Sequence, residues 1–196
     1  MSLMLKKEFI QKRGTNYRKF LLYNDRVIVE LKTLKKINKY EIRLEDLGFN
    51  KLYQADNTKP GKITSGIFFL IPFIVLIVSI VKHDIDIFFL VYISVMFFIL
   101  AALIYFKQGQ DDIYLTGGKQ NLVFYRMIPN EPVVLKFIDE VILTTKEYLK
   151  DKYARFDDYT LEQSYINGLI YLKNQEIITS QEFQEFIDDY KTSRLL

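Results

Sequence analysis

The sequence of 196 residues contains no cysteine, and its single histidine is His83. The absence of cysteine excludes disulfide bonds and thiolate metal sites. One histidine without cysteine cannot form a zinc site of the usual type. His83 belongs to the short polar segment 82–86 (KHDID), whose simplest interpretation is a solvated turn, with a weak metal site or a pH-sensitive contact as the alternative. We therefore expect neither a metal ion nor another cofactor.

Catalytic motifs are also missing. The chain has no GxxxxGK[ST] phosphate-binding loop and no GxSxG nucleophile elbow. Gly117-Gly118-Lys119 fits a tight turn better than a phosphate cradle. Adjacent carboxylates are expected to be solvated surface charge, because neighbouring residues on a strand or helix point apart. They occur at Asp111-Asp112, Asp139-Glu140 and Asp157-Asp158. The sequence predicts a protein that is not an enzyme.

Charged residues are absent from two long stretches. Ile63–Val81 has nineteen residues and Ile87–Phe106 has twenty, all without charge. A helix of about twenty residues spans the roughly 30 Å hydrocarbon core of a bilayer. The stretches therefore predict a two-helix transmembrane hairpin, because the helices of a soluble core are usually shorter. The lack of ionisable groups inside them favours an anchor over a transport path.

Lysine and arginine gather outside the two stretches. Residues 1–62 carry 15 of them against 7 acidic residues, and residues 107–196 carry 11 against 15. Only Lys82 lies between the stretches. Basic residues beside membrane spans stay on the cytoplasmic side. We expect a two-pass integral protein of the bacterial inner membrane with both termini in the cytoplasm.

Both flanks show the alternation of apolar and polar residues that predicts half-buried antiparallel strands. Before the apolar stretches, the expected strands are Tyr17–Tyr23, Arg26–Thr33, Ile37–Leu44 and, more weakly, Phe49–Gln54. After the stretches, the expected strands are Asp112–Thr116 and Asn121–Met127, joined by a turn at Gly117-Gly118. Two or three strands alone form a marginal unit. We therefore expect the two flanks to complete one domain.

A long amphipathic helix is expected after the last strand. Asn130 is a suitable N-cap, and Pro132 fits the first turn, where its missing N–H costs nothing. Apolar residues then recur with helical spacing, and the helix is expected to continue to Tyr153. These apolar residues are Val134, Phe137, Ile138, Val141 and Ile142.

Strands followed by one amphipathic helix resemble a bacterial pleckstrin-homology-like (PH-like) domain. The resemblance is carried by RVIVELKTLKKINKYEIRLEDL, Arg26–Leu47, and by NLVFYRMIPNEPVVLKFIDEVI, Asn121–Ile142, and it covers roughly residues 17–153. It implies an α+β membrane protein in which a transmembrane hairpin interrupts an antiparallel PH-like β domain with a C-terminal helix. Seven strands are expected of the family, and five or six are legible here.

The last forty residues are expected to form a separate helical hairpin. Thr160-Leu161-Glu162-Gln163 and Thr179-Ser180-Gln181-Glu182 both fit the capping box that begins a helix. The segment INGLIYLKNQEIITSQEFQEFIDDY, Ile166–Tyr190, resembles the short C-terminal helical hairpin called SHOCT. So small a unit needs a surface to dock on, either its own sheet or a partner.

These expectations divide the chain into four parts. Residues 1–62 and 107–153 are the two halves of the PH-like domain. Residues 63–106 are the transmembrane hairpin, with helices at 63–81 and 87–106. Residues 160–196 are the SHOCT-like hairpin.

Two surfaces are candidates for binding. Basic residues of the first half are expected to face anionic lipid, with ordinary positive-inside charge as the alternative explanation. They are Arg18, Lys19, Lys32, Lys35, Lys36 and Lys39. Apolar residues of the last helix are expected to bind a protein partner. They are Phe183, Phe186, Ile187 and Tyr190. Nucleic acid is not expected, because the second half is acidic.

The expected function is a membrane-anchored, non-catalytic binding or regulatory module at the cytoplasmic face, which engages anionic lipid, a protein partner or both. One alternative is an immunity or accessory protein that neutralises a secreted or membrane-active toxin. Another is a subunit of a transporter or membrane enzyme.

Overall fold

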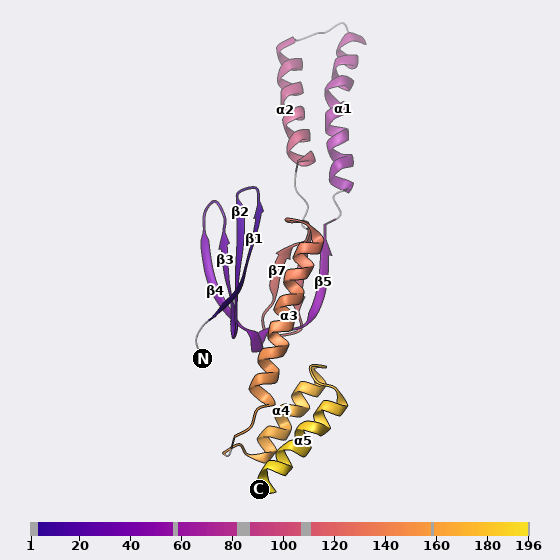
Figure 1. Ribbon diagram of the computed structural model, residues 1–196. Coiled ribbons are helices and arrows are strands. Elements are labelled where there is room, and N and C mark those ends of the chain that lie inside the picture. The colour runs from indigo at the N-terminus through magenta and orange to yellow at the C-terminus, as the bar shows by residue number, and fades with distance from the viewer. Residues whose placement is uncertain (1–3, 57–58, 82–86, 107–110, 158, 196) are drawn as a thin grey trace. The chain divides into compact units, whose positions relative to one another are not determined.

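A computed structural model of the chain describes residues 4–56, 59–81, 87–106, 111–157 and 159–195 (Figure 1). Within these ranges the fold is α+β, as the sequence predicts, with two antiparallel sheets and five α-helices. The chain divides into two compact units. One contains Met1–Tyr53 together with Asp112–Leu196, and the other contains Gln54–Asp111. We call them the sheet unit and the helix pair, and each is described by itself.

The first sheet of the sheet unit is an antiparallel meander of four strands in chain order. The strands are β1 (Leu5–Arg13), β2 (Asn16–Tyr23), β3 (Arg26–Lys32) and β4 (Ile37–Arg43). The three strands predicted here are confirmed. Strand β1 was not predicted, because polar Gln11 points inward beside Phe9 while apolar Ile10 points outward. This inverts the alternation by which a half-buried strand is found.

The second sheet contains three strands in the order β5-β6-β7. They are β5 (Asn50–Ala55), β6 (Asp111–Thr116) and β7 (Leu122–Tyr125), and the short 3-10 helix η1 (Leu44–Asp46) precedes β5. Strand β7 ends two residues earlier than predicted. Strands β5 and β6 are neighbours in the sheet although both long apolar helices lie between them in the sequence.

Helix α3 (Glu131–Tyr153) covers the core that the two sheets share. The predicted cap is confirmed, because the Asn130 side chain accepts a hydrogen bond from Val133 N–H at 3.0 Å. Four of the five predicted apolar positions are fully buried and Ile142 is partly buried. The ring of Phe137 stacks on Phe9 with centroids 4.5 Å apart. The core thus contains residues from both sides of the apolar stretches.

Helices α4 (Glu162–Asn174) and α5 (Ser180–Leu195) pack with the end of α3 in a second apolar cluster. The capping box of α5 is confirmed, since the Glu182 carboxylate accepts from Thr179 N–H at 2.8 Å and the Thr179 hydroxyl accepts from Glu182 N–H at 3.1 Å. The box predicted for α4 is wrong. The N-cap is Leu161, without a side-chain hydrogen bond, and the Thr160 hydroxyl instead donates to the Asp157 carboxylate at 2.6 Å.

The helix pair consists of α1 (Lys59–Val81) and α2 (Ile87–Tyr105). Both helices are long and apolar enough to cross a membrane. They contact each other through aromatic rings, such as Phe69 and Phe98 at 5.2 Å, and through the Ser65 hydroxyl, which donates to the Ala101 carbonyl at 2.7 Å. Helix α1 continues through Pro72 and begins four residues before the predicted stretch. Residues 82–86 with His83 lie outside the described residues.

Candidate functional site

One end of the first sheet brings together the β1–β2 turn and the β3–β4 turn. The register places Arg18 of β2 opposite Gln11 and Leu31, close to both turns. The Arg18 guanidinium lies 3.6 Å from the carboxylate of Asp112, the second residue of β6. We call this end, with residues 14–15 and 33–36, the basic end.

The β3–β4 turn is held in a defined shape by its own hydrogen bonds. Thr33 N–H donates to the Lys36 carbonyl at 2.8 Å, and Lys36 N–H donates to the Thr33 hydroxyl at 3.2 Å. Between these two residues, Leu34 is 82% exposed, and Ile37 beyond them is 64% exposed. A large apolar side chain therefore stands in solvent at the tip of a preformed turn.

Four lysines surround this tip, and all four are exposed. We call the segment Lys32–Lys39, which contains Lys32, Lys35, Lys36 and Lys39, the basic turn. In the part of the chain that the structure describes, these four make no ion pair. The lysines that do form ion pairs there are Lys6, Lys7, Lys19, Lys51, Lys119, Lys150 and Lys152. The positive charge of the basic turn is thus available to an external anion.

The basic turn continues onto the outer face of the first sheet. The register joins Lys12, Tyr17, Lys32 and Ile37 in one row across the four strands. Side chains directly opposite each other in neighbouring strands lie on the same face, about 5 Å apart. This row therefore places another exposed cation, Lys12, and an aromatic ring beside the turn.

Two of the six predicted lipid-facing residues do not belong to this exposed set. The Arg18 side chain is 19% exposed, donates to the Val123 carbonyl at 3.0 Å and lies 3.7 Å from the Tyr125 ring centroid. Lys19 forms an ion pair of 2.8 Å with Glu8, and this hydrogen-bonded carboxylate raises the pKa of the Lys19 amine. Arg18 thus holds β2 against the second sheet, while the other four predicted lysines form the basic turn.

Sequence reasoning did not select Leu34, Ile37 and Lys12 as members of the site. The signal for Leu34 was present, because LKTLKK places one apolar residue within a run of lysines. The expected strands Arg26–Thr33 and Ile37–Leu44 placed a turn between them, but they did not show that Leu34 stands exposed at its tip. Lys12 was seen as part of the basic N-terminal segment but was not among the six residues selected, because β1, which places it beside the turn, was not predicted.

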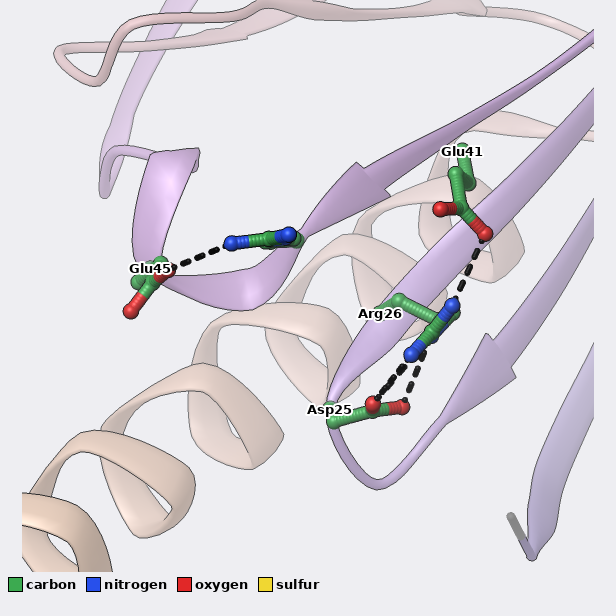
Figure 2. Close-up of polar contacts among 5 residues, drawn as sticks. Asp25, Arg26, Glu41 and Glu45 are labelled. Atoms are coloured by element: carbon green, nitrogen blue, oxygen red, sulfur yellow. Dashed lines mark hydrogen bonds and ion pairs between the residues drawn. The ribbon is translucent and has the colours of Figure 1, made fainter.

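The opposite end of the sheet unit is charged but neutralised. Leu44 N–H donates to the Asp25 carbonyl at 2.9 Å, which places η1 beside the β2–β3 turn. The Arg26 guanidinium bonds both Asp25 and Glu41, and its hydrogen bonds hold the pKa of the Asp25 carboxyl below its ordinary value (Figure 2). Glu45 of η1 pairs with Lys152 at the end of α3, and this contact lowers the pKa of Glu45.

The paired carboxylates do not converge on a catalytic centre. Asp139 binds Lys51 at 2.5 Å, whereas the adjacent Glu140 binds Lys7. Asp112 lies beside Arg18, and Asp157 accepts from Thr160. Asp158 lies outside the described residues, among which no group of three potential metal ligands is found. Each of these described carboxylates thus contacts a separate partner, whereas the lysines of the basic turn form no ion pair in the described part of the chain.

The four predicted partner-binding residues face the chain's own interior. Tyr190 is buried, and Phe183, Phe186 and Ile187 are partly buried in the cluster that α4 and α5 form with α3. The Tyr190 hydroxyl donates to the Thr160 carbonyl at 3.0 Å, and Lys150 of α3 lies 5.5 Å from the Phe186 ring centroid. The hairpin was expected to dock on its own sheet or on a partner, and the structure shows it packed on α3.

Comparison of the chain with protein-family models, curated proteins and solved structures finds no match. Two features of the chain point to a function: the apolar helix pair, and the exposed lysines around Leu34 in the basic turn.

Proposed function

We propose that this chain is a non-catalytic, membrane-anchored binding module whose basic end contacts anionic lipid headgroups at the cytoplasmic face of the bacterial inner membrane. The observation that carries the proposal is the basic turn, with four exposed lysines that form no ion pair among the described residues. Lysines beside the cytoplasmic leaflet are attracted to its anionic lipids.

The helix pair supports the anchor. Only 11% of the most apolar window of α1 and 6% of that of α2 is buried inside the structure. A core helix of a soluble protein of this length would have most of its surface covered by the fold. Covering these faces with hydrocarbon removes the same apolar area from water.

The two-pass orientation is supported by the sheet order and by the charges. Strands β5 and β6 are neighbours, so the chain leaves the sheet unit and returns to it at the same end. An even number of crossings between them satisfies this arrangement. The lysines outside the helix pair favour the cytoplasmic side for both flanks.

The resemblance to PH-like and SHOCT-like domains supports a binding role. In the described residues, seven strands form sheets of four and three, and α3 follows them, which agrees with the proposed PH-like domain. Helices α4 and α5 agree with the proposed SHOCT-like hairpin in the same way. A resemblance of fold does not identify a ligand, whereas the exposed lysines indicate an anionic one.

Because the helix pair already anchors the chain, headgroup contact is not needed to recruit it to the membrane. Each lysine near an anionic surface contributes about 1 kcal/mol, which is weak for recruiting a free protein. An anchored domain already has a high effective concentration at the bilayer. The basic turn therefore orients the sheet unit on the leaflet and makes that orientation depend on lipid charge.

Cysteine labelling of the full chain tests the proposal without background, because the native chain has no thiol. Asp84→Cys, Asn38→Cys and Gln181→Cys report on the segment between the helices and on the two flanks. In intact cells, a membrane-impermeant maleimide should label position 84 alone. Labelling of positions 38 and 181 from opposite sides of the membrane would exclude the two-pass arrangement.

The Asn38→Cys chain then tests lipid contact. In nanodiscs of phosphatidylcholine with phosphatidylglycerol, a water-soluble maleimide should react with the thiol at position 38 more slowly than in phosphatidylcholine alone. Lys35→Glu with Lys36→Glu should weaken this protection at least about thirtyfold, from about 1 kcal/mol per lysine. The matched control, Lys173→Glu with Lys191→Glu, makes the same charge change in α4 and α5 and should preserve it. Equal protection of the thiol with and without phosphatidylglycerol would refute headgroup binding.

A further inference from the structure

The basic turn combines charge with an exposed apolar tip. One exposed leucine is ordinary on a protein surface. Leu34 is different because it stands at the apex of a turn, with Lys32 and Lys35 on either side and Ile37 following. The turn is closed by three hydrogen bonds between Thr33 and Lys36. Presenting Leu34 to a partner therefore requires little additional ordering of the chain.

We infer that the basic turn is a membrane-inserting tip: Leu34 enters the acyl region of an anionic leaflet while the surrounding lysines bind the headgroups. The inference rests on the proposed function and deepens it. The occupant of this surface is the lipid leaflet itself, and it is recognised by negative charge above an apolar layer.

Three observations favour a leaflet over a protein surface. The lysines match an anionic layer, and their apolar stems can lie against the same hydrocarbon that receives Leu34. Lys12 and Tyr17 extend the basic and amphipathic surface along one row of the sheet. The turn and the β1–β2 turn lie at the same end of the first sheet, so that both can meet one extended surface.

The two contributions are of comparable size, so neither is sufficient alone. Full burial of a leucine side chain strengthens an association between about tenfold and a hundredfold. Each lysine near an anionic surface strengthens it about fivefold. Insertion should therefore need both Leu34 and the lysine charge. The extent of insertion should then depend on the negative charge of the leaflet.

The absence of tryptophan from the chain allows a direct experiment. In the full chain, Leu34→Trp introduces a single indole at the tip. The matched control Leu161→Trp places it at a residue that is 74% exposed, before α4. In nanodiscs of phosphatidylcholine and phosphatidylglycerol, indole emission from position 34 should shift to shorter wavelength and be quenched by lipids with brominated acyl chains. Emission from position 161 should do neither, and removing phosphatidylglycerol should abolish the effect at position 34.

A second variant avoids relying on the indole's own affinity for interfaces. In the Asn38→Cys chain, Leu34→Ser should reduce the lipid-dependent protection of the thiol at least about tenfold, while Leu161→Ser should leave it unchanged. Unquenched emission from position 34 together with intact protection of the thiol at position 38 would overturn insertion and leave headgroup contact standing. Absence of protection when the turn carries Asn38→Cys alone would overturn the proposed function itself.

Discussion

At the scale of single residues, Gln11 has the most consequential contacts in the sheet unit. Its amide is completely buried between β1 and β7, the edge strands of the two sheets. Its oxygen accepts from Tyr125 N–H at 2.9 Å, and its nitrogen donates to the Tyr125 and Ile128 carbonyls at 2.7 and 2.5 Å. The side chain thus replaces a missing strand partner for Tyr125 and joins the N-terminal sheet to the C-terminal one.

Replacing this amide tests that role. Gln11→Leu keeps a similar volume but leaves buried backbone groups of β7 without partners, each of which costs about 1–3 kcal/mol. We expect the free energy of unfolding to fall by about 2–5 kcal/mol in a thermal or denaturant titration. Gln120→Leu makes the same chemical change at an exposed position and should cost less than about 0.5 kcal/mol. Equal effects of the two variants would show that the buried amide contributes nothing special.

The same residue shows what sequence reasoning could not reach. A glutamine in the sequence KEFIQKR looks like an ordinary solvent-exposed side chain, because its burial depends on Tyr125, which is more than a hundred residues away. Leu34 was missed for a related reason: its exposure follows from the turn, not from its type. Lys35 and Lys36 were predicted correctly as exposed cations, since charged residues at a strand–strand turn stay in water without help from distant partners.

At the scale of elements, local patterns predicted what local interactions decide. The stripe of α3 and the capping box of α5 are both confirmed, because spacing and nearby hydrogen bonds define them. The box at Thr160 failed because the Thr160 hydroxyl oxygen accepts from Asp157 N–H at 2.9 Å and not from a backbone N–H of α4, and Leu161 is the N-cap. Strand β1 required knowledge of its pairing with β2 and of the inward position of Gln11.

The attachment of α5 to α3 should depend on pH through Glu182. Its pKa is lowered first by the hydrogen bond from Lys150 at 2.7 Å and then by Thr179 N–H. A lowered carboxyl pKa stabilises the fold above the ordinary value of 4.5, and that stabilisation is lost as pH falls through the folded-state value. We therefore expect the protection of the α5 amides, measured relative to their intrinsic exchange rate at each pH, to fall between neutral pH and pH about 3.

Variants of Glu182 separate its two contacts. Glu182→Gln keeps a side chain that can cap α5 but removes the charge, so it should flatten the pH dependence. Glu182→Ala removes both contacts and should weaken α5 by about 1 kcal/mol more. Glu185→Gln changes an exposed neighbour whose bond is local to α5 and should preserve the wild-type profile. A profile that Glu182→Gln leaves unchanged would place the pH response elsewhere.

At the scale of the whole molecule, the helix pair occupies the connection of what would otherwise be a β-hairpin. Strands β5 and β6 each have six residues and are neighbours in the second sheet. The Thr116 hydroxyl donates to the Asn50 carbonyl at 3.3 Å, which aligns the end of β6 with the start of β5. The other ends, Ala55 and Asp111, therefore face each other, and the core of the sheet unit contains no residue from the helix pair.

This arrangement predicts that the helix pair can be removed without unfolding the sheet unit. Replacing residues 56–110 by Asn-Gly joins Ala55 to Asp111 through a two-residue turn that suits antiparallel strands. The shortened chain should be water-soluble and unfold cooperatively, because Phe9 and Phe20 still meet Phe124 and Phe137. In that background, Phe137→Asp should prevent folding by burying a charge, whereas Lys136→Asp on the neighbouring position should not. An insoluble shortened chain would mean that the two halves of the sheet unit need the helix pair to assemble.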